Sequence, residues 1–132
     1  MNLTSEIGKL GEDMVAKYLQ KQGCLITRRN YHSKYGEIDI VAEKGEYIFF
    51  IEVKTREENS QITPAGAVSK SKQRKIVLTA KDYIAKLRID INYRFDIAEV
   101  VYKIDQNGQF HASLNYIRNA FNEEVLDNSK PF

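Results

Sequence analysis

The spacing of apolar residues predicts two amphipathic helices. From about residue 4 to residue 22, apolar side chains recur at intervals of three and four positions, as on one helical face. The same spacing returns from about Ser69 to Arg88, with most basic residues away from the apolar face. The first helix contains Gly8 and Gly11, and a glycine costs about 1 kcal/mol relative to alanine there. We therefore expect this helix to approach a sheet or a ligand closely.

Five further segments are rich in β-branched and aromatic residues and predict strands. They cover residues 24–31, 36–43, 47–55, 93–104 and 109–117, and a short helix is predicted near 119–126. Lys44-Gly45 predicts a tight hairpin between the second and third strands, and Asn107-Gly108 predicts another between the last two. The connection from the third strand through the second helix is long enough for a right-handed parallel crossover. The predicted α/β fold is a central mixed sheet flanked by helices, in the order α-β-β-β-α-β-β.

Length and composition favour a small cytoplasmic protein. The 132 residues predict one domain over 1–132, with the tail 118–132 loosely packed. A single cysteine, Cys24, excludes an intramolecular disulfide and favours a reducing compartment. We find no signal-peptide pattern at the amino terminus, and the longest apolar run, 47–51, is too short to span a bilayer. The expected location is the cytoplasm, without membrane contact.

Charge is nearly balanced over the whole chain but uneven along it. The 20 basic and 18 acidic residues argue against a polycation or an acidic disordered tail. Between Lys70 and Arg88, however, seven basic residues accompany one acidic residue, Asp82. This excess fits contact with a polyanion, and it equally fits an ordinary solvated helix face. The predicted contacts to nucleic-acid phosphates are Lys72, Arg74 and Lys75.

The first predicted hairpin brings acidic side chains together. Alternate side chains of a strand share a face, so a two-residue Lys44-Gly45 loop places Asp39 opposite Phe50 and diagonal to Glu52. The same register places Glu37 opposite Glu52. A three-residue loop would instead turn Asp39 to the other face. Carboxylates this close on an apolar face repel each other and are costly to bury, and a divalent cation would remove both problems.

These carboxylates predict a site for Mg²⁺ or Mn²⁺, because zinc would be expected to recruit Cys or His, which are scarce here. Lys54 follows Glu52 by two residues on the same face. Its ammonium would lie beside the metal, where it could orient a water or neutralise charge on a phosphate. The alternative interpretation is an exposed strand face with ordinary surface charges.

Other candidate residues have weaker patterns. His32 and His111 lie far apart without ligand-type spacing, which favours surface or hydrogen-bonding roles. Cys24 precedes two apolar residues and is predicted to be a buried strand residue rather than a nucleophile. Asp96 either joins the acidic cluster or pairs near Arg94, and the sequence leaves both open.

Two motifs resemble those of a nuclease superfamily. The run GEIDIV at 36–41 followed by EVKTR at 52–56 resembles the PD-(D/E)xK nucleases, which have the restriction-endonuclease-like fold. Over nearly its full length the chain is similar to the small bacterial YraN-type proteins, relatives of archaeal Holliday-junction resolvases. Ile38 stands where the superfamily has proline, but a metal needs the carboxylate rather than the proline. The other residues that support the resemblance are Gly8, Gly11-Glu12, Arg94-Phe95-Asp96 and Ala120-Phe121.

The resemblance implies a metal-dependent active site. It implies that Asp39 and Glu52 are metal ligands, with Val53 offering its backbone carbonyl. It further implies that Glu12 completes the acidic cluster and that Lys54 is the catalytic lysine. The expected activity is hydrolysis of DNA phosphodiester bonds, on linear or branched DNA, by direct attack of a metal-activated water. A homodimer is suggested by analogy with the resolvases alone.

Two other functions compete with this one. The first is a nucleic-acid-binding protein that keeps the nuclease fold and serves as a non-catalytic partner. The second is a protein-interaction domain without a nucleic-acid role, which leaves both the acidic cluster and the basic helix unexplained.

Overall fold

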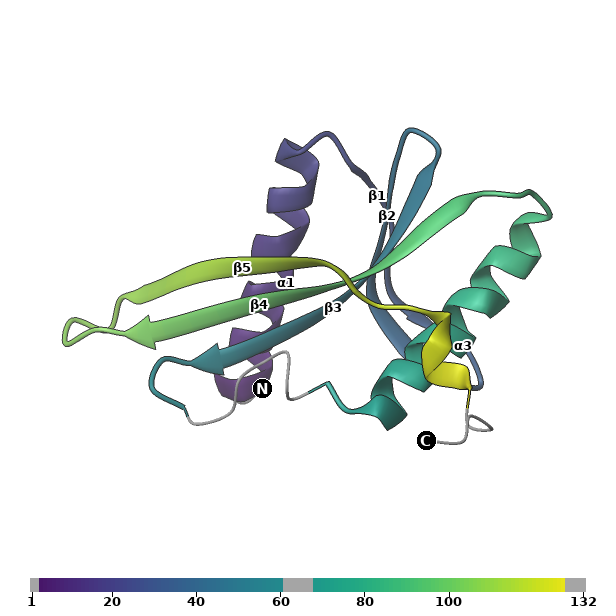
Figure 1. Cartoon of the computed structure of the whole chain (residues 1–132). Helices are drawn as coiled ribbons and strands as arrows, with labels where there is room; N and C mark the ends of the chain where they lie inside the picture. Colours follow the sequence, from purple (N-terminus) through teal and green to yellow (C-terminus); the bar gives the residue numbers. More distant parts are fainter. Residues whose placement is uncertain (1–2, 61–67, 128–132) are drawn as a thin grey trace.

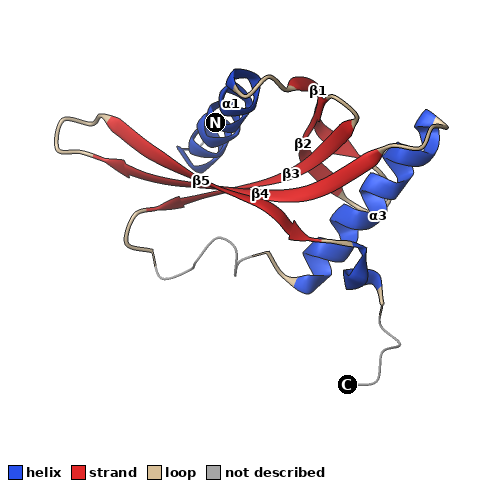
Figure 2. Ribbon diagram, turned by 45° about the horizontal axis from the view of Figure 1, so that its top comes forward, coloured by secondary structure: helices blue, strands red, loops and turns tan. Residues whose placement is uncertain are grey.

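The computed structural model describes residues 3–60 and 68–127 (Figure 1). It contains one five-stranded sheet with a helix on each face, as Figure 2 shows. The elements in chain order are α1 (Leu3–Lys21), β1 (Leu25–His32), β2 (Glu37–Lys44), β3 (Tyr47–Glu57), α3 (Lys70–Leu87), β4 (Asn92–Ile104), β5 (Phe110–Phe121) and the 3₁₀ helix η1 (Glu123–Leu126). This order and the α/β class confirm the prediction from the sequence. The predicted terminal helix is shorter than expected, because β5 continues through Phe121.

The strands lie side by side in the order β1-β2-β3-β4-β5. Neighbouring strands are antiparallel except β3 and β4, which are parallel over eleven residue pairs that begin at Tyr47 and Asn92. Helix α3 lies between these two strands in the chain, as the predicted crossover requires. Among the described residues, no helix is both long and apolar enough to cross a membrane.

The core is divided into two apolar layers by the sheet. Alternate residues of β3 enter different layers, because Ile48 and Phe50 pack with α3 while Phe49 and Ile51 pack with α1. Both helices therefore bury one amphipathic face, as their spacing predicts. The residues of the two helices buried in these layers are Val15, Ala16 and Leu19 from α1, and Ile76, Val77, Ala80 and Tyr83 from α3.

The hairpin between β2 and β3 has a different register from the predicted one. Lys44 pairs with Tyr47, so the two-residue loop is Gly45-Glu46 rather than Lys44-Gly45. Gly45 has φ of 59°, and the tight hairpin turns require a positive φ at the first loop position, which glycine adopts without strain. Because the loop still has two residues, side-chain parity is kept. The pairing shifts by two residues, and Val41 rather than Asp39 lies opposite Phe50.

Only one of the two helix glycines has the close contact expected from the sequence. At Gly11 a Cβ atom would overlap Thr55 Oγ1 and lie 3.3 Å from two other side-chain atoms of Thr55. Helix α1 therefore approaches β3 at a distance that only glycine permits. At Gly8 no atom of the described residues lies within 4 Å of a Cβ position, so close approach to the sheet does not explain this glycine.

Candidate active site

Two acidic side chains face each other on adjacent strands. Extending the register of β2 and β3 places Asp39 opposite Glu52, on the sheet face that α3 covers. The Asp39 carboxylate accepts a 2.8 Å hydrogen bond at Oδ2 from the backbone N–H of Val53. Glu52 is buried, with 3% of its surface exposed. The predicted pairing of these carboxylates on one face is therefore present, and they lie closer than the predicted diagonal arrangement.

The electrostatic environment of this pair disfavours the ionised form of Asp39. Burial, and after it the nearby Glu52 carboxylate, raise the pKa of Asp39 to about 7. The hydrogen bond from Val53 and the charge of Lys72 oppose the increase without cancelling it. A carboxyl group with such a pKa binds a proton near neutral pH because its ionised form is not fully compensated.

Two lysine ammonium groups approach the same oxygen of Glu52. Lys54 Nζ lies 3.7 Å from Glu52 Oε2, as strand parity predicts, and Lys72 Nζ lies 3.2 Å from it. Lys72 belongs to the first turn of α3, where its backbone N–H donates to the capping hydroxyl of Ser69. Burial lowers the pKa of Lys72, but the charges of Glu52 and Asp39 outweigh this effect and raise it. Two lysine side chains therefore lie beside the two carboxyl groups.

The position of Lys72 is the feature that sequence reasoning missed. The sequence predicts Lys72 as a phosphate contact on the basic helix, whereas its ammonium lies beside the acidic pair. Nothing in the local pattern around Lys72 could reveal this contact, because twenty positions separate it from Glu52 in the chain. The available signal was Ser69, which can cap the start of α3 after a polar connection and so marks where the helix begins near the sheet.

Glu12 lies apart from this pair in the structure. Its Oε1 atom accepts from Arg29 Nε at 3.0 Å and forms an ion pair with Arg29 Nη2 at 2.9 Å. Asn30 Nδ2 donates to the same oxygen at 3.3 Å. In residues 3–60 and 68–127, no three acidic, histidine or cysteine side chains gather closely enough to hold a metal ion. The structure thus brings Asp39 and Glu52 together and leaves Glu12 in an ion pair with β1.

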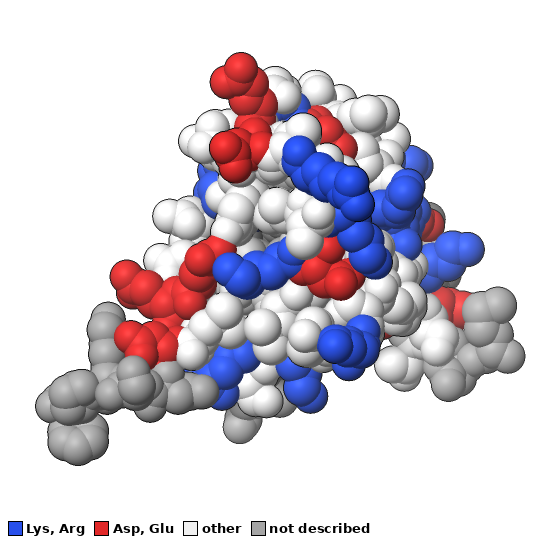
Figure 3. All heavy atoms as spheres, turned by 90° about the vertical axis from the view of Figure 1, so that its right-hand side faces the viewer, with Lys and Arg blue, Asp and Glu red and all other residues white. Residues whose placement is uncertain are grey.

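The other two basic residues predicted to contact phosphates differ in their environments. Arg74 is partly buried, and its Nε donates to the carbonyl of Val125 at 3.0 Å, which attaches α3 to η1. Lys75 is exposed. Figure 3 shows Lys and Arg side chains around a small acidic group on the side of the molecule where α3 lies. Of the two residues, Lys75 is therefore the one whose charge is available to a large polyanion.

Asp96 belongs to a separate cluster. It is fully buried and accepts hydrogen bonds from Arg94 Nε at 2.8 Å and from the Tyr116 hydroxyl at 2.6 Å. The backbone N–H of Asn119 donates to it at 2.8 Å. The structure therefore decides between the two roles left open by the sequence: Asp96 pairs with Arg94.

The histidines and the cysteine lie outside the acidic pair. His32 lies 3.9 Å from Glu37, and His111 lies 2.7 Å from Asp105, both on exposed strand surfaces. Glu37 pairs with His32 across β1 and β2. The predicted position of Glu37 opposite Glu52 is wrong, because the observed β2–β3 register is shifted by two residues. Burial raises the pKa of the Cys24 thiol, which disfavours the nucleophilic thiolate.

Comparison with known proteins identifies one family over most of the chain. The family described as "Uncharacterised protein family UPF0102" matches residues 11–100, a span that includes both acidic residues and both lysines. A UPF0102 protein of Alkaliphilus metalliredigens is 42% identical over 120 residues, covering 90% of this chain and 100% of the relative. UPF0102 proteins of Clostridium perfringens and Dictyoglomus thermophilum are 43% and 41% identical, covering 87% and 88% of this chain and 93% and 97% of each relative.

Proposed function

We propose that this chain, which belongs to the UPF0102 (YraN-type) family, is a metal-dependent nuclease that hydrolyses DNA phosphodiester bonds. The observation that supports this proposal is the set formed by Asp39, Glu52 and Lys54. Two carboxylates from adjacent strands face each other on an apolar sheet, with an ammonium group 3.7 Å from one of them. Linear and branched DNA are both candidate substrates.

The donor groups of this site fit Mg²⁺ or Mn²⁺. Both ions prefer oxygen ligands, and Mg²⁺ commonly takes one or two protein carboxylates together with water and substrate phosphates. Asp39 and Glu52 supply two such carboxylates, and a bound cation would favour the ionised form of Asp39, whose pKa burial and the Glu52 charge raise to about 7. Glu12 is held by Arg29, so the proposed ligand set is the two strand carboxylates. A cation there would supply an activated water and charge neutralisation at the phosphate.

The two lysines have distinct roles in this mechanism. Lys54 follows Glu52 on β3, so its ammonium is positioned to orient the attacking water and to stabilise charge that builds on the phosphate oxygens. Lys72 comes from α3 and has a side chain 46% exposed, so it can leave Glu52 and contact a neighbouring phosphate. Its positive charge compensates the negative charge of Glu52 in the free protein and that of a substrate phosphate in the complex.

DNA binding in this proposal occurs on the side of the molecule where α3 lies, because the basic side chains gather there around the acidic group. Phosphate contacts of this kind are independent of sequence and sensitive to salt. Replacing Lys72 and Lys75 with glutamine should weaken binding about equally for different DNA sequences. It should also flatten the dependence of affinity on salt concentration.

The decisive experiment compares single-turnover cleavage by the wild-type protein and Lys54→Ala. Branched and linear DNA are incubated with Mn²⁺, with Mg²⁺ and with a chelator. We expect cleavage only with metal, reduced by roughly 10²–10³-fold in Lys54→Ala, as for loss of one preorganised electrostatic group. Metal affinity measured by calorimetry should stay the same or increase, because a competing positive charge is removed. Lys103→Ala is the matched control, since Lys103 is an exposed lysine of the β4–β5 hairpin.

A second function is supported by the ion pairs themselves. Lys54 and Lys72 already compensate Glu52 without a metal, which suits a protein that binds DNA without cutting it. Salt-sensitive DNA binding with no cleavage under any metal condition would favour this non-catalytic role. Full cleavage activity in Lys54→Ala would contradict the nuclease mechanism as drawn.

A further inference from the structure

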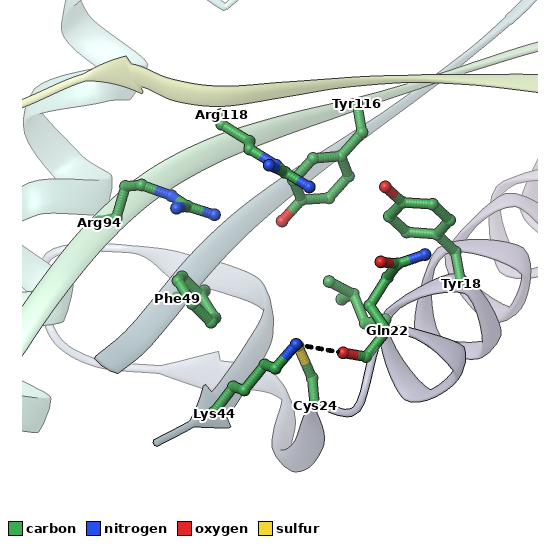
Figure 4. Close-up of a pocket in the computed structure, with 9 residues that line it drawn as sticks. Tyr18, Gln22, Cys24, Lys44, Phe49, Arg94, Tyr116 and Arg118 are labelled. Atoms are coloured by element: carbon green, nitrogen blue, oxygen red, sulfur yellow. Dashed lines mark hydrogen bonds between the residues drawn. The ribbon is translucent and has the colours of Figure 1, made fainter. Parts of the chain in front are cut away.

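A polar cavity lies on the sheet face covered by α1, opposite the face of Asp39 and Glu52. It has a volume of about 190 Å³ and lies between the end of α1, the end of β2 and the strands β3, β4 and β5 (Figure 4). We propose that this cavity binds a phosphate monoester group. Three basic side chains from three different strands line it: Lys44, Arg94 and Arg118.

Arg94 is held rigidly in position by a buried partner. Its Nε and Nη2 atoms donate to the two oxygens of Asp96 at 2.8 and 3.0 Å, and Asp96 is fully buried. The guanidinium also stacks on the ring of Phe49, with its central carbon 4.4 Å from the ring centroid. Among the described residues, Nη1 has no acceptor. Arg94 therefore presents an oriented donor whose geometry is set before any ligand binds.

Arg118 and Lys44 add charge that the surrounding protein does not balance. Within residues 3–60 and 68–127, Arg118 has neither an ion pair nor a hydrogen bond, and Figure 4 shows its guanidinium turned toward the cavity. Lys44 donates one hydrogen bond, 2.6 Å long, to the carbonyl of Gln22 and keeps two further N–H donors. Three cations thus stand against the single carboxylate of Asp96, an excess of two positive charges. An anion in the cavity would relieve their mutual repulsion.

A phosphate monoester matches this charge and these donors better than a carboxylate does. It has a charge of about −1.5 to −2 near pH 7, whereas a carboxylate has a single negative charge. Guanidinium groups bind phosphate oxygens through paired N–H donors, and the ammonium of Lys44 adds a mobile charge. The cavity is smaller than the roughly 300–1,000 Å³ typical of sites for drug-sized ligands. It therefore suits a phosphate group better than a whole drug-sized ligand.

Two sources could supply such a group: a free nucleotide, or the 5′-terminal phosphate of a nucleic-acid strand. Calorimetry with a chelator present distinguishes them, using inorganic phosphate, adenosine monophosphate, and one single-stranded oligonucleotide with either a 5′-phosphate or a 5′-hydroxyl. We expect saturable binding of the phosphate compounds. A preference for the 5′-phosphorylated strand over its hydroxyl form would identify the strand end as the source, and equal binding of the two strands would identify the free nucleotide.

The key variant is Arg118→Gln, which removes an exposed charge without disturbing the buried Arg94–Asp96 pair. Phosphate affinity should fall roughly 10- to 100-fold, as for loss of a hydrogen bond to a charged group. Arg28→Gln is the matched control, because Arg28 is an exposed arginine of β1 whose one hydrogen bond within the described part of the chain is to the adjacent carbonyl of Thr27. Absence of saturable phosphate binding, or equal weakening by both substitutions, would overturn the proposal. No divalent metal is used, so this outcome is independent of the nuclease test.

Discussion

Substituting Asp39 with asparagine should stabilise the metal-free protein at neutral and higher pH. Asparagine keeps an oxygen that can accept the hydrogen bond from Val53, and it removes the charge that Glu52 repels. The pKa of Asp39 rises from an ordinary 3.8 to about 7. At 1.36 kcal/mol per tenfold change in proton affinity, this difference corresponds to at most about 4 kcal/mol. The protein relaxes around a charged group, so we expect a gain of about 1–4 kcal/mol in the free energy of unfolding at pH 8.

The dependence on pH follows from the direction of this shift. In the folded protein Asp39 holds its proton up to about pH 7, whereas in the unfolded chain it loses the proton near pH 4. Between these values the folded state binds more protons, so stability falls as pH rises, by up to about 1.4 kcal/mol per pH unit. The advantage of Asp39→Asn should therefore be absent near pH 4, grow between pH 4 and 7, and stay constant above pH 7.

Urea unfolding with a chelator present, at pH 4, 5, 6, 7 and 8, measures this effect. Tyrosine fluorescence is a suitable probe, because the chain contains eight tyrosines and no tryptophan. Asp90→Asn is the matched control, since Asp90 is exposed beyond the end of α3. Added Mn²⁺ should stabilise the wild-type protein much more than Asp39→Asn. A loss of several kcal/mol in Asp39→Asn at pH 8 would refute the reasoning, because it would show that the ionised carboxylate is a structural ion-pair partner.

Two further predictions test the surroundings of the site. Lys72→Gln removes the ammonium 3.2 Å from Glu52, so it should lower the stability of the metal-free protein and raise its Mn²⁺ affinity. Unfolding in the presence of a chelator measures the first effect, and calorimetry with Mn²⁺ measures the second. Weaker Mn²⁺ binding by the variant would contradict the contact. Gly11→Ala should destabilise the protein by 1 kcal/mol or more, on the order of a strained core substitution, because its new methyl group would overlap Thr55. Gly8→Ala should stabilise it by about 1 kcal/mol, because its Cβ position is open. Thermal unfolding compares the two variants. If Gly11→Ala were the more stable of the two, the close approach of α1 to β3 would be disproved.

Local sequence patterns determined which segments form helices and strands. The 3.6-residue period of helices and the two-residue period of strands can be recognised from residues close together in the chain, so recognising them does not require knowing how the elements pack. Parity alone also placed Asp39, Glu52 and Lys54 on one face, and that result survived a wrong choice of loop residues. The register of β2 against β3 could not be predicted without the conformation of the turn. In the sequence, Gly45 could be the first or the second residue of the loop, and its φ of 59° in the structure fits the first position.

Contacts between distant segments were decided by the tertiary structure alone. Lys72 reaches Glu52 because of where the first turn of α3 docks on the sheet, and Glu12 pairs with Arg29 because α1 lies beside β1. Arg118 lines the cavity only because β5 lies beside β4 and α1 covers the same face. Such contacts depend on the relative placement of whole elements, which many side chains determine together through packing. The relative placement of elements therefore cannot be predicted from any short stretch of sequence. The face on which a side chain lies can be predicted, because it depends only on positions within a single strand or helix.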